Sequence, residues 1–138
     1  MIKILILDDS KVIRTLLKMT LDSDGIATDL AATVDEAMHF AMHNEYDAMI
    51  IDYMLEDGRN GLELVEAIKS SGKNINTPTI MLSAEDGDNR KESAQTLGVK
   101  AWMKKPFTPP GMLKVVYRVL GKEFGSKKKS ERSMHHRN

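Results

Sequence analysis

Two apolar runs that each end in aspartate dominate the pattern of the chain. Residues 2–7 are apolar except for Lys3 and stop at Asp8-Asp9-Ser10, and residues 48–51 stop at Asp52. Continuous apolar runs of this length are typical of strands that are buried on both faces of a sheet. Both runs therefore predict buried strands with acidic side chains at their carboxyl ends.

Helical periodicity follows each of the first two strands. Apolar residues recur at three- and four-residue spacing over residues 11–23, and Asp24-Gly25 closes that segment. Residues 27–31 form a weakly marked strand. Thr33 and Glu36 then make a capping box, which predicts the start of a second helix.

The same alternation continues to about residue 119. Further helices are expected over residues 62–70, through 94–97, and over 109–119, where Pro109-Pro110 is a favoured helix start. Strands are expected over residues 79–82, ending at Ser83, and over 101–103. A polar stretch, residues 85–89, separates the fourth strand from the fourth helix.

Five strands that alternate with five helices predict a doubly wound, flavodoxin-like α/β sandwich with a parallel sheet. The common strand order 2-1-3-4-5 places strands 1 and 3 side by side, and ligands of such sheets bind beyond the carboxyl ends of the strands. Asp8, Asp9, Asp52 and Ser83 all follow strands and are therefore expected at one rim.

Three carboxylates at one rim repel one another unless a cation joins them, and an all-oxygen donor set suits Mg²⁺. Lys105, directly after the fifth strand, adds an ammonium group, and Ser83 adds a hydroxyl, so the rim could receive a phosphoryl group. Helix capping is the alternative for Asp8 or Asp9. It leaves Asp52 unexplained.

Composition narrows the class of protein. The 138 residues are 41% apolar and 29% charged with zero net charge, which is typical of one globular domain. The absence of cysteine excludes thiol chemistry and disulfides. No apolar run approaches the length of a membrane helix and the first residues do not resemble a secretory signal, so a cytoplasmic location without membrane contact is expected.

Charge is distributed unevenly along the chain. Residues 121–138 carry six Lys/Arg and two Asp/Glu, which leaves 14 and 18 in residues 1–120. The mildly acidic body argues against direct DNA binding, and the basic tail is too short for a DNA-reading domain. We expect a domain at residues 1–120 and a tail at 121–138 that is a solvated end, a linker stub or a contact for an anionic partner.

Four motifs in order resemble the receiver domains of two-component response regulators, over about residues 2–120. The resemblance rests on the acidic pair Asp8-Asp9 after strand 1 and Ile50-Ile51-Asp52 at the end of strand 3. Ser83-Ala84 after strand 4 and Lys105-Pro106-Phe107 after strand 5 complete the pattern.

The resemblance implies a chemistry for the rim. Asp52 would be the phosphoacceptor and nucleophile, taking a phosphoryl group from a histidine kinase or phosphotransfer protein. Asp9 and Asp52 would bind Mg²⁺ directly, Asp8 through a water, and the carbonyl of Met54 would be a further ligand. The protein would be its own substrate rather than an enzyme with a separate one, and would lose the phosphoryl group by autodephosphorylation.

Other residues acquire switching roles by the same resemblance. Lys105 would neutralise developing charge, Ser83 would hydrogen-bond the acquired phosphoryl group, and Trp102 would move inward as the switch aromatic. Lys105-Pro106 would be a cis peptide bond. Met54 and Glu85 would flank the water that removes the phosphoryl group; we expect the weakly accepting thioether of Met54 to shield phosphorus and to give a long lifetime.

The chain departs from the family pattern at two places. The segment after Asp52 lacks the usual proline and reaches its glycine, Gly61, nine residues on rather than eight, as if one residue were inserted. The switch position holds Trp102, where tyrosine or phenylalanine is more usual.

Alternatives remain at two levels. A Mg²⁺-dependent phosphatase of the haloacid dehalogenase type fits poorly, because its two aspartates after strand 1 are two residues apart. A dinucleotide-binding protein would need a glycine-rich turn where Asp9-Ser10-Lys11 stands. Within the receiver class, the chain is either a stand-alone regulator, like those of chemotaxis or phosphorelays, or the receiver part of a longer regulator.

Overall fold

A computed structural model describes residues 1–55, 58–70, 72–84 and 91–122 of the chain, and for residues 91–93 the backbone only. The predicted polar stretch 85–89, with Glu85, and the basic tail from residue 123 onward lie outside the described residues. No helix in the described part of the chain is long and apolar enough to cross a membrane.

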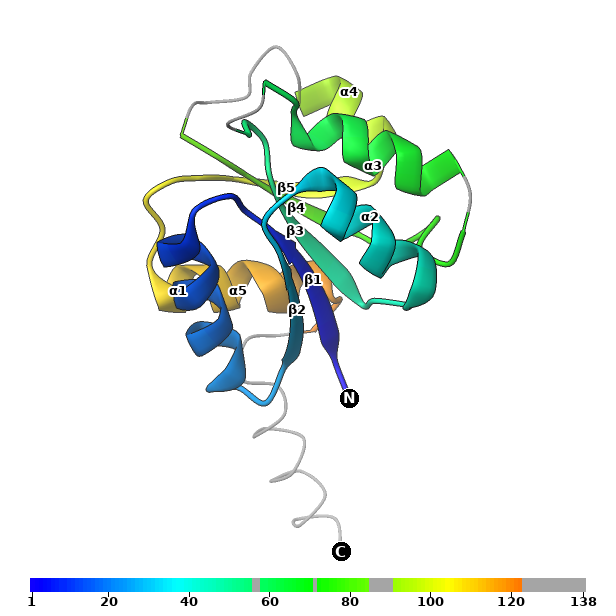
Figure 1. Cartoon of the computed structure of the whole chain (residues 1–138). Coiled ribbons are helices and arrows are strands. Elements are labelled where there is room, and N and C mark those ends of the chain that lie inside the picture. Colours follow the sequence, from blue (N-terminus) through cyan, green and yellow to red (C-terminus); the bar gives the residue numbers. More distant parts are fainter. Residues whose placement is uncertain (56–57, 71, 85–90, 123–138) are drawn as a thin grey trace, which may run out of the picture.

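Strands and helices alternate along the described chain, as the apolar pattern predicts (Figure 1). The strands are β1 (Lys3–Leu7), β2 (Ala27–Ala31), β3 (Ala48–Asp52), β4 (Thr79–Ser83) and β5 (Val99–Lys104). The helices are α1 (Lys11–Asp22), α2 (Val34–His43), α3 (Gly61–Ser70), α4 (Lys91–Thr96) and α5 (Pro109–Val119).

All five strands form one parallel sheet in the order β2-β1-β3-β4-β5, which confirms the predicted doubly wound fold. β1 and β3 are neighbours, with Leu7 in register with Ile51. The acidic residues that follow these two strands therefore leave the sheet side by side. β5 is longer than the predicted segment 101–103, since as an edge strand it includes exposed lysines at 100 and 104 that hide the apolar pattern.

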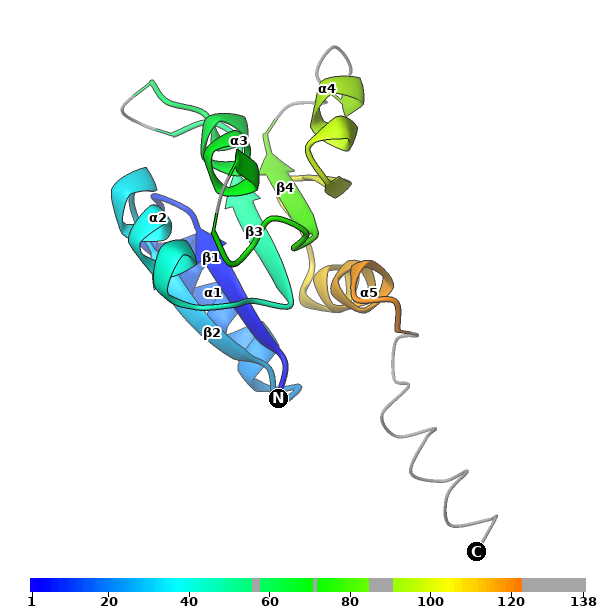
Figure 2. The ribbon, with the colours of Figure 1, turned by 90° about the vertical axis from the view of Figure 1, so that its right-hand side faces the viewer.

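Each face of the sheet has its own apolar core. On one face, alternate strand residues such as Leu5, Met49 and Met81 pack under α2, α3 and α4. On the other, Ile4 and Ile50 pack under α1 and α5. Figures 1 and 2 show these two helical layers on opposite sides of the sheet. Burial on both faces explains why β1 and β3 read as continuous apolar runs.

Side-chain caps start four of the described helices; α3 is capped by Asn60, whose Oδ1 accepts a hydrogen bond from the Glu63 amide at 3.1 Å. Ser10 caps α1 by accepting a hydrogen bond from the Ile13 amide at 3.3 Å, so neither Asp8 nor Asp9 is the cap. Thr33 caps α2 at 3.1 Å from the Glu36 amide, as the capping box predicts. Thr108 caps α5, and Pro109 follows at the first helical position.

A buried polar network closes the amino end of the sheet. The amide of Asn74, only 1% exposed, makes four hydrogen bonds. Its Oδ1 accepts from the Tyr46 amide at 2.9 Å and the Thr77 hydroxyl at 3.0 Å, and its Nδ2 donates to the carbonyls of Ala41 at 2.7 Å and Asn44 at 2.8 Å. All the hydrogen-bonding capacity of this amide is used. It joins the end of α2 and the start of β3 to the segment before β4.

Candidate functional site

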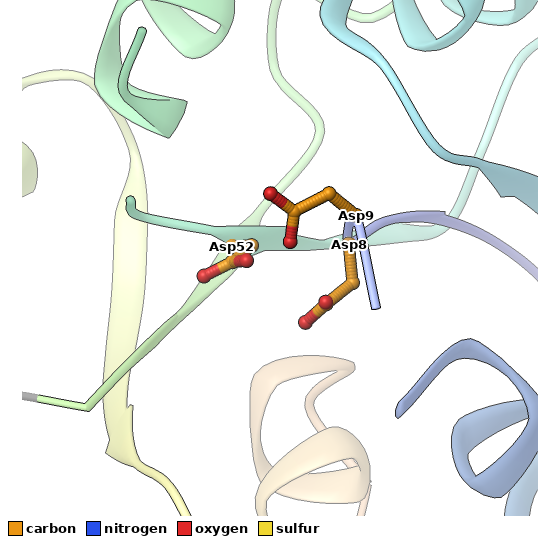
Figure 3. Close-up of side chains that lie close together, drawn as sticks. All are labelled: Asp8, Asp9 and Asp52. Atoms are coloured by element: carbon orange, nitrogen blue, oxygen red, sulfur yellow. The ribbon is translucent and has the colours of Figure 1, made fainter. Parts of the chain in front are cut away.

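Three aspartates converge at the carboxyl end of the sheet. Asp8 and Asp9 follow β1 and Asp52 ends β3, and one carboxylate oxygen of each lies within 4.8 Å of the others (Figure 3). Asp8 and Asp52 are buried and Asp9 is partly exposed. The structure thus brings together the residues that the strand-end pattern placed at one rim.

The turn after β1 holds Asp8 firmly in place. Its Oδ1 accepts a hydrogen bond from the Ser10 amide at 2.9 Å, and its carbonyl accepts one from Arg14 Nη1 at 2.8 Å. Arg14 reaches back from the first turn of α1 to the residue two positions before the helix cap. Arg14 was not predicted from the sequence; its position one helical turn after Ser10 was the only signal.

Lys105 supplies the ammonium group that the sequence placed at this rim. Its Nζ lies 2.9 Å from Asp8 Oδ2 and 3.3 Å from Asp52 Oδ1. Its backbone amide donates to the Ser83 carbonyl at 2.8 Å, which ties the end of β5 to the end of β4. The Lys105-Pro106 peptide bond is cis, as the resemblance implies.

Burial and crowding make Asp52 an unusually weak acid. Burial, and then the charge of Asp8, raise the pKa of Asp52 from 3.8 to about 6, although Lys105 opposes the shift. Burial acts to lower the pKa of Lys105, but hydrogen bonding and attraction to Asp8 and Asp52 prevail and raise it. Among the described residues, the ammonium group of Lys105 pairs with Asp8 and Asp52, and the cluster of three carboxylates favours a bound cation.

Ser83 lies beside the phosphoacceptor candidate. Asp52 is in register with Leu82, and Ser83 is the next residue along β4, 2% exposed. The Tyr53 amide donates to the Leu82 carbonyl at 2.7 Å, so the backbones stay joined one residue past the end of β3. The hydroxyl of Ser83 thus belongs to the same rim as Asp52.

Trp102 contacts the residue that follows Asp52. Its ring lies 5.2 Å from the Tyr53 ring, centroid to centroid, at an interplanar angle of 48°. Tyr53 is buried, whereas Trp102 is partly exposed at the sheet edge. This ring contact joins the residue after Asp52 to the aromatic residue on β5. The sequence predicts Trp102 near the site but gives no sign of its contact with Tyr53.

The segment after β3 folds back as a short hairpin. Met54 pairs antiparallel with Asn60, between the bonds Gly61 N–H to Tyr53 carbonyl at 2.7 Å and Leu55 N–H to Arg59 carbonyl at 3.1 Å. Because its neighbours make these two bonds, the carbonyl of Met54 itself points away from the opposite strand of the hairpin. The Met54 side chain is 58% exposed.

Gly61 packs against the backbone of Asp52. A Cβ built at this position would lie 2.6 Å from Ile51 Cγ2 and closer still to the Asp52 carbonyl oxygen. Any larger residue would push α3 away from the end of β3. This close approach explains why a glycine stands at the start of α3, nine residues after Asp52.

A model of the response regulator receiver domain matches residues 4–117. The transcriptional regulatory protein ResD of Bacillus subtilis is 34% identical over 107 residues, which cover 78% of this chain and 43% of that protein. The transcriptional regulatory protein SrrA of Staphylococcus aureus is 32% identical over 107 residues, 78% of this chain and 43% of that protein. The chain thus spans less than half the length of these curated relatives.

Solved structures match over most of their length. The chemotaxis protein CheY4 of Vibrio cholerae superimposes with a TM-score of 0.81 at 33% identity, covering 86% of this chain and 98% of that one. The receiver domain of the sensor histidine kinase PA1611 from Pseudomonas aeruginosa, solved with Mg²⁺ coordinated in its active-site cleft, gives 0.76 at 25% identity, over 87% of this chain and 98% of that one.

Proposed function

This chain belongs to the response regulator receiver domains of two-component signalling, and on that premise we propose that Asp52 is its phosphoacceptor. The donor would be a phosphohistidine on a histidine kinase or phosphotransfer protein. The observation that carries the proposal is the meeting of three carboxylates from β1 and β3 with Lys105 in a largely buried rim.

The donor set suits Mg²⁺. Three carboxylates with oxygens within 4.8 Å of one another offer hard oxygen ligands and excess negative charge. Asp9, Asp52 and the outward-pointing carbonyl of Met54 would hold the ion, and Asp8 would act through a water. When bound, Mg²⁺ supplies positive charge that lowers the repulsion between Asp52 and an incoming phosphoryl group.

Transfer to Asp52 exchanges one phosphorus bond for another. An Asp52 carboxylate oxygen attacks phosphorus in line with the phosphohistidine nitrogen; the new P–O bond forms as the P–N bond breaks, and the electron pair leaves with the imidazole. Lys105, which already lies 3.3 Å from Asp52 Oδ1, neutralises charge on the transferring oxygens. The apolar residues beneath the rim exclude water from the reacting carboxylate.

Phosphorylation would then reach the surface through Ser83 and Trp102. Ser83 hydrogen-bonds the acquired phosphoryl group from the next strand. Trp102 changes its packing against Tyr53, whose backbone follows Asp52 directly. A protein target that binds the face around Trp102 would distinguish the two states.

The domain bounds, the location and the partners are proposed on the same premise. We place the receiver domain at residues 1–120 and a basic tail at 121–138, in the cytoplasm, with an unidentified protein target and no direct DNA contact by the receiver itself. Because the curated relatives are more than twice as long as the matched segment, the chain is either a stand-alone regulator or the receiver of a larger one.

Acetyl phosphate with Mg²⁺ tests the assignment by intact mass. The wild type should gain one phosphoryl group and Asp52→Asn should gain none. Asp22→Asn, which removes an exposed carboxylate that pairs with Lys18 on α1, is the matched control and should be modified like the wild type. Equal modification of Asp52→Asn and the wild type would overturn the assignment.

A further inference from the structure

Two histidines form an exposed pair on α2, on the flank of the molecule rather than at the acidic rim. His39 and His43 are one helical turn apart, both exposed, with ring centroids 4.4 Å apart and an interplanar angle of 38°. Residues four apart on a helix lie on the same face, so both imidazoles project from one patch of surface.

A backbone contact selects the tautomer of His43. Its Nδ1 lies 2.8 Å from the carbonyl oxygen of His39. A carbonyl can only accept a hydrogen bond, so Nδ1 carries the hydrogen and the lone pair of the neutral ring is on Nε2. Metal-ligating histidines are commonly held this way, with one ring nitrogen bonded to a carbonyl and the other free to bind.

The place in the helix also favours a cation. His43 is the last residue of α2, where the unpaired carbonyls of the final turn concentrate negative potential. This end of the helix carries no Lys or Arg on α2 itself. Capping of the helix end alone would explain the contact of His43 with the carbonyl, but not the second imidazole stacked one turn before it.

We propose that His39 and His43 bind a borderline transition-metal ion such as Ni²⁺, Cu²⁺ or Zn²⁺ through two imidazole nitrogens, at a site separate from the acidic rim. The two sites divide metals by ligand type: oxygen ligands at the rim suit Mg²⁺, whereas imidazole suits Zn²⁺, Cu²⁺ and Ni²⁺. Affinity should rise from Mn²⁺ to Cu²⁺ and fall again at Zn²⁺.

Calorimetric titration with Ni²⁺, in excess Mg²⁺ at pH 7.5, tests the site. The parent protein should be His135→Ala/His136→Ala, which removes the two histidines of the tail as competing ligands. His39→Gln and His43→Gln in that background should each weaken Ni²⁺ binding by about 100-fold, because the second imidazole of a chelating pair acts at high effective concentration.

Two controls keep the result specific. Met42→Leu removes an exposed thioether on the same face and should leave Ni²⁺ binding unchanged, since thioethers favour softer ions. Residues 39, 42 and 43 are exposed, and the far-UV circular dichroism of variants at these positions should match the parent. Unchanged Ni²⁺ affinity in the His39→Gln/His43→Gln variant would overturn the proposal, as would a parent in which the ring signals of these histidines do not respond to Ni²⁺.

Discussion

Buried polar groups are paired in different ways at the two ends of the parallel sheet. At the amino end, Asn74 makes all four hydrogen bonds that its amide allows, to partners from α2, the start of β3 and the segment before β4. At the carboxyl end, three carboxylates lie close together, and Lys105 pairs with two of them, Asp8 and Asp52. The first arrangement is neutral and satisfied; the second is charged and incomplete.

The difference distinguishes residues that stabilise the fold from residues that can bind a ligand. A satisfied network holds its elements in one geometry and has nothing left to offer a ligand. A cluster of carboxylates raises the free energy of the fold until a cation binds, and that interaction is available for binding a ligand. Substitutions at the two ends are therefore expected to change the free energy of unfolding in opposite directions.

The largest effect on stability is expected at the amino end. Asn74→Ala should lower the free energy of unfolding by about 3–5 kcal/mol, because buried groups such as the Tyr46 amide and the Ala41 carbonyl lose their partners. Urea unfolding measures the loss. The exposed Asn76→Ala is the control and should stay within about 0.5 kcal/mol of the wild type.

The same variant tests whether the two ends are independent. Folded Asn74→Ala, kept below its unfolding transition, should still accept a phosphoryl group at Asp52 at the wild-type rate. A large loss of phosphorylation without a loss of stability would show that the amino end takes part in the chemistry and that the two ends are not independent.

The second effect has the opposite sign. Asp52→Asn should raise the free energy of unfolding at pH 7.5 without Mg²⁺ by up to about 3 kcal/mol, since it removes a charge whose pKa is raised from 3.8 to about 6. Equilibrium unfolding in urea with EDTA measures the gain. A less stable Asp52→Asn protein would mean that the ionised carboxylate contributes to the fold.

The pH dependence of the free energy of unfolding tests the same effect of Asp52. A raised pKa means that the folded protein holds the Asp52 proton more tightly than the unfolded chain does. Its contribution is complete below pH 3.8 and is lost as the pH rises through about 6. The advantage of Asp52→Asn over the wild type should therefore be small at pH 4 and grow to its full size by pH 7.5; an advantage that is equal at both values would contradict the assignment.

A third, smaller effect concerns the lifetime of the phosphoryl group. Met54→Asn should speed autodephosphorylation by about tenfold, or about 1.4 kcal/mol of barrier, because an amide can orient the attacking water and a thioether cannot. Loss of label from the phosphorylated protein measures the rate. Met54→Leu keeps the bulk without a hydrogen bond and should match the wild type; an asparagine variant that is no faster would show that Met54 does not limit the reaction.

The smallest effect is optical. Binding of beryllofluoride with Mg²⁺ should change the emission of Trp102, the only tryptophan, because its ring stacks on Tyr53 beside Asp52. Asp52→Asn should show no change under the same conditions. Constant emission in a wild type that binds beryllofluoride would exclude a switching role for Trp102.

Much of the carboxyl end could be predicted from the sequence. Buried parallel strands read as apolar runs, and a charged residue that stops such a run is conspicuous, as Asp8 and Asp52 are. The alternation of strands and helices predicts a doubly wound parallel sheet, and 2-1-3-4-5 is a common strand order for such sheets. The helix cap was less certain: a choice among Asp8, Asp9 and Ser10 depends on backbone angles, and the structure assigns it to Ser10.

The amino end could not be predicted in the same way. Asn74 lies in a polar loop, where one asparagine resembles another, and its four partners come from residues 28 to 33 positions away as well as from nearby Thr77. The ring contact of Tyr53 with Trp102 likewise joins the residue after β3 to a residue inside β5, and β4 lies between these two strands. Contacts of this kind leave no periodic signal. The proposed influence of Glu85 lies outside the described residues and stays a prediction.

Gly61 has a consequence for how the loop before it can change in length. Its backbone packs on Asp52, and its amide donates to the Tyr53 carbonyl, so both ends of the hairpin are held beside Asp52. Residues added or removed between these anchors leave both anchors in place. The contact of Gly61 with Asp52 therefore gives a geometric reason why an insertion there is tolerated, because the carboxylate of Asp52 keeps its position.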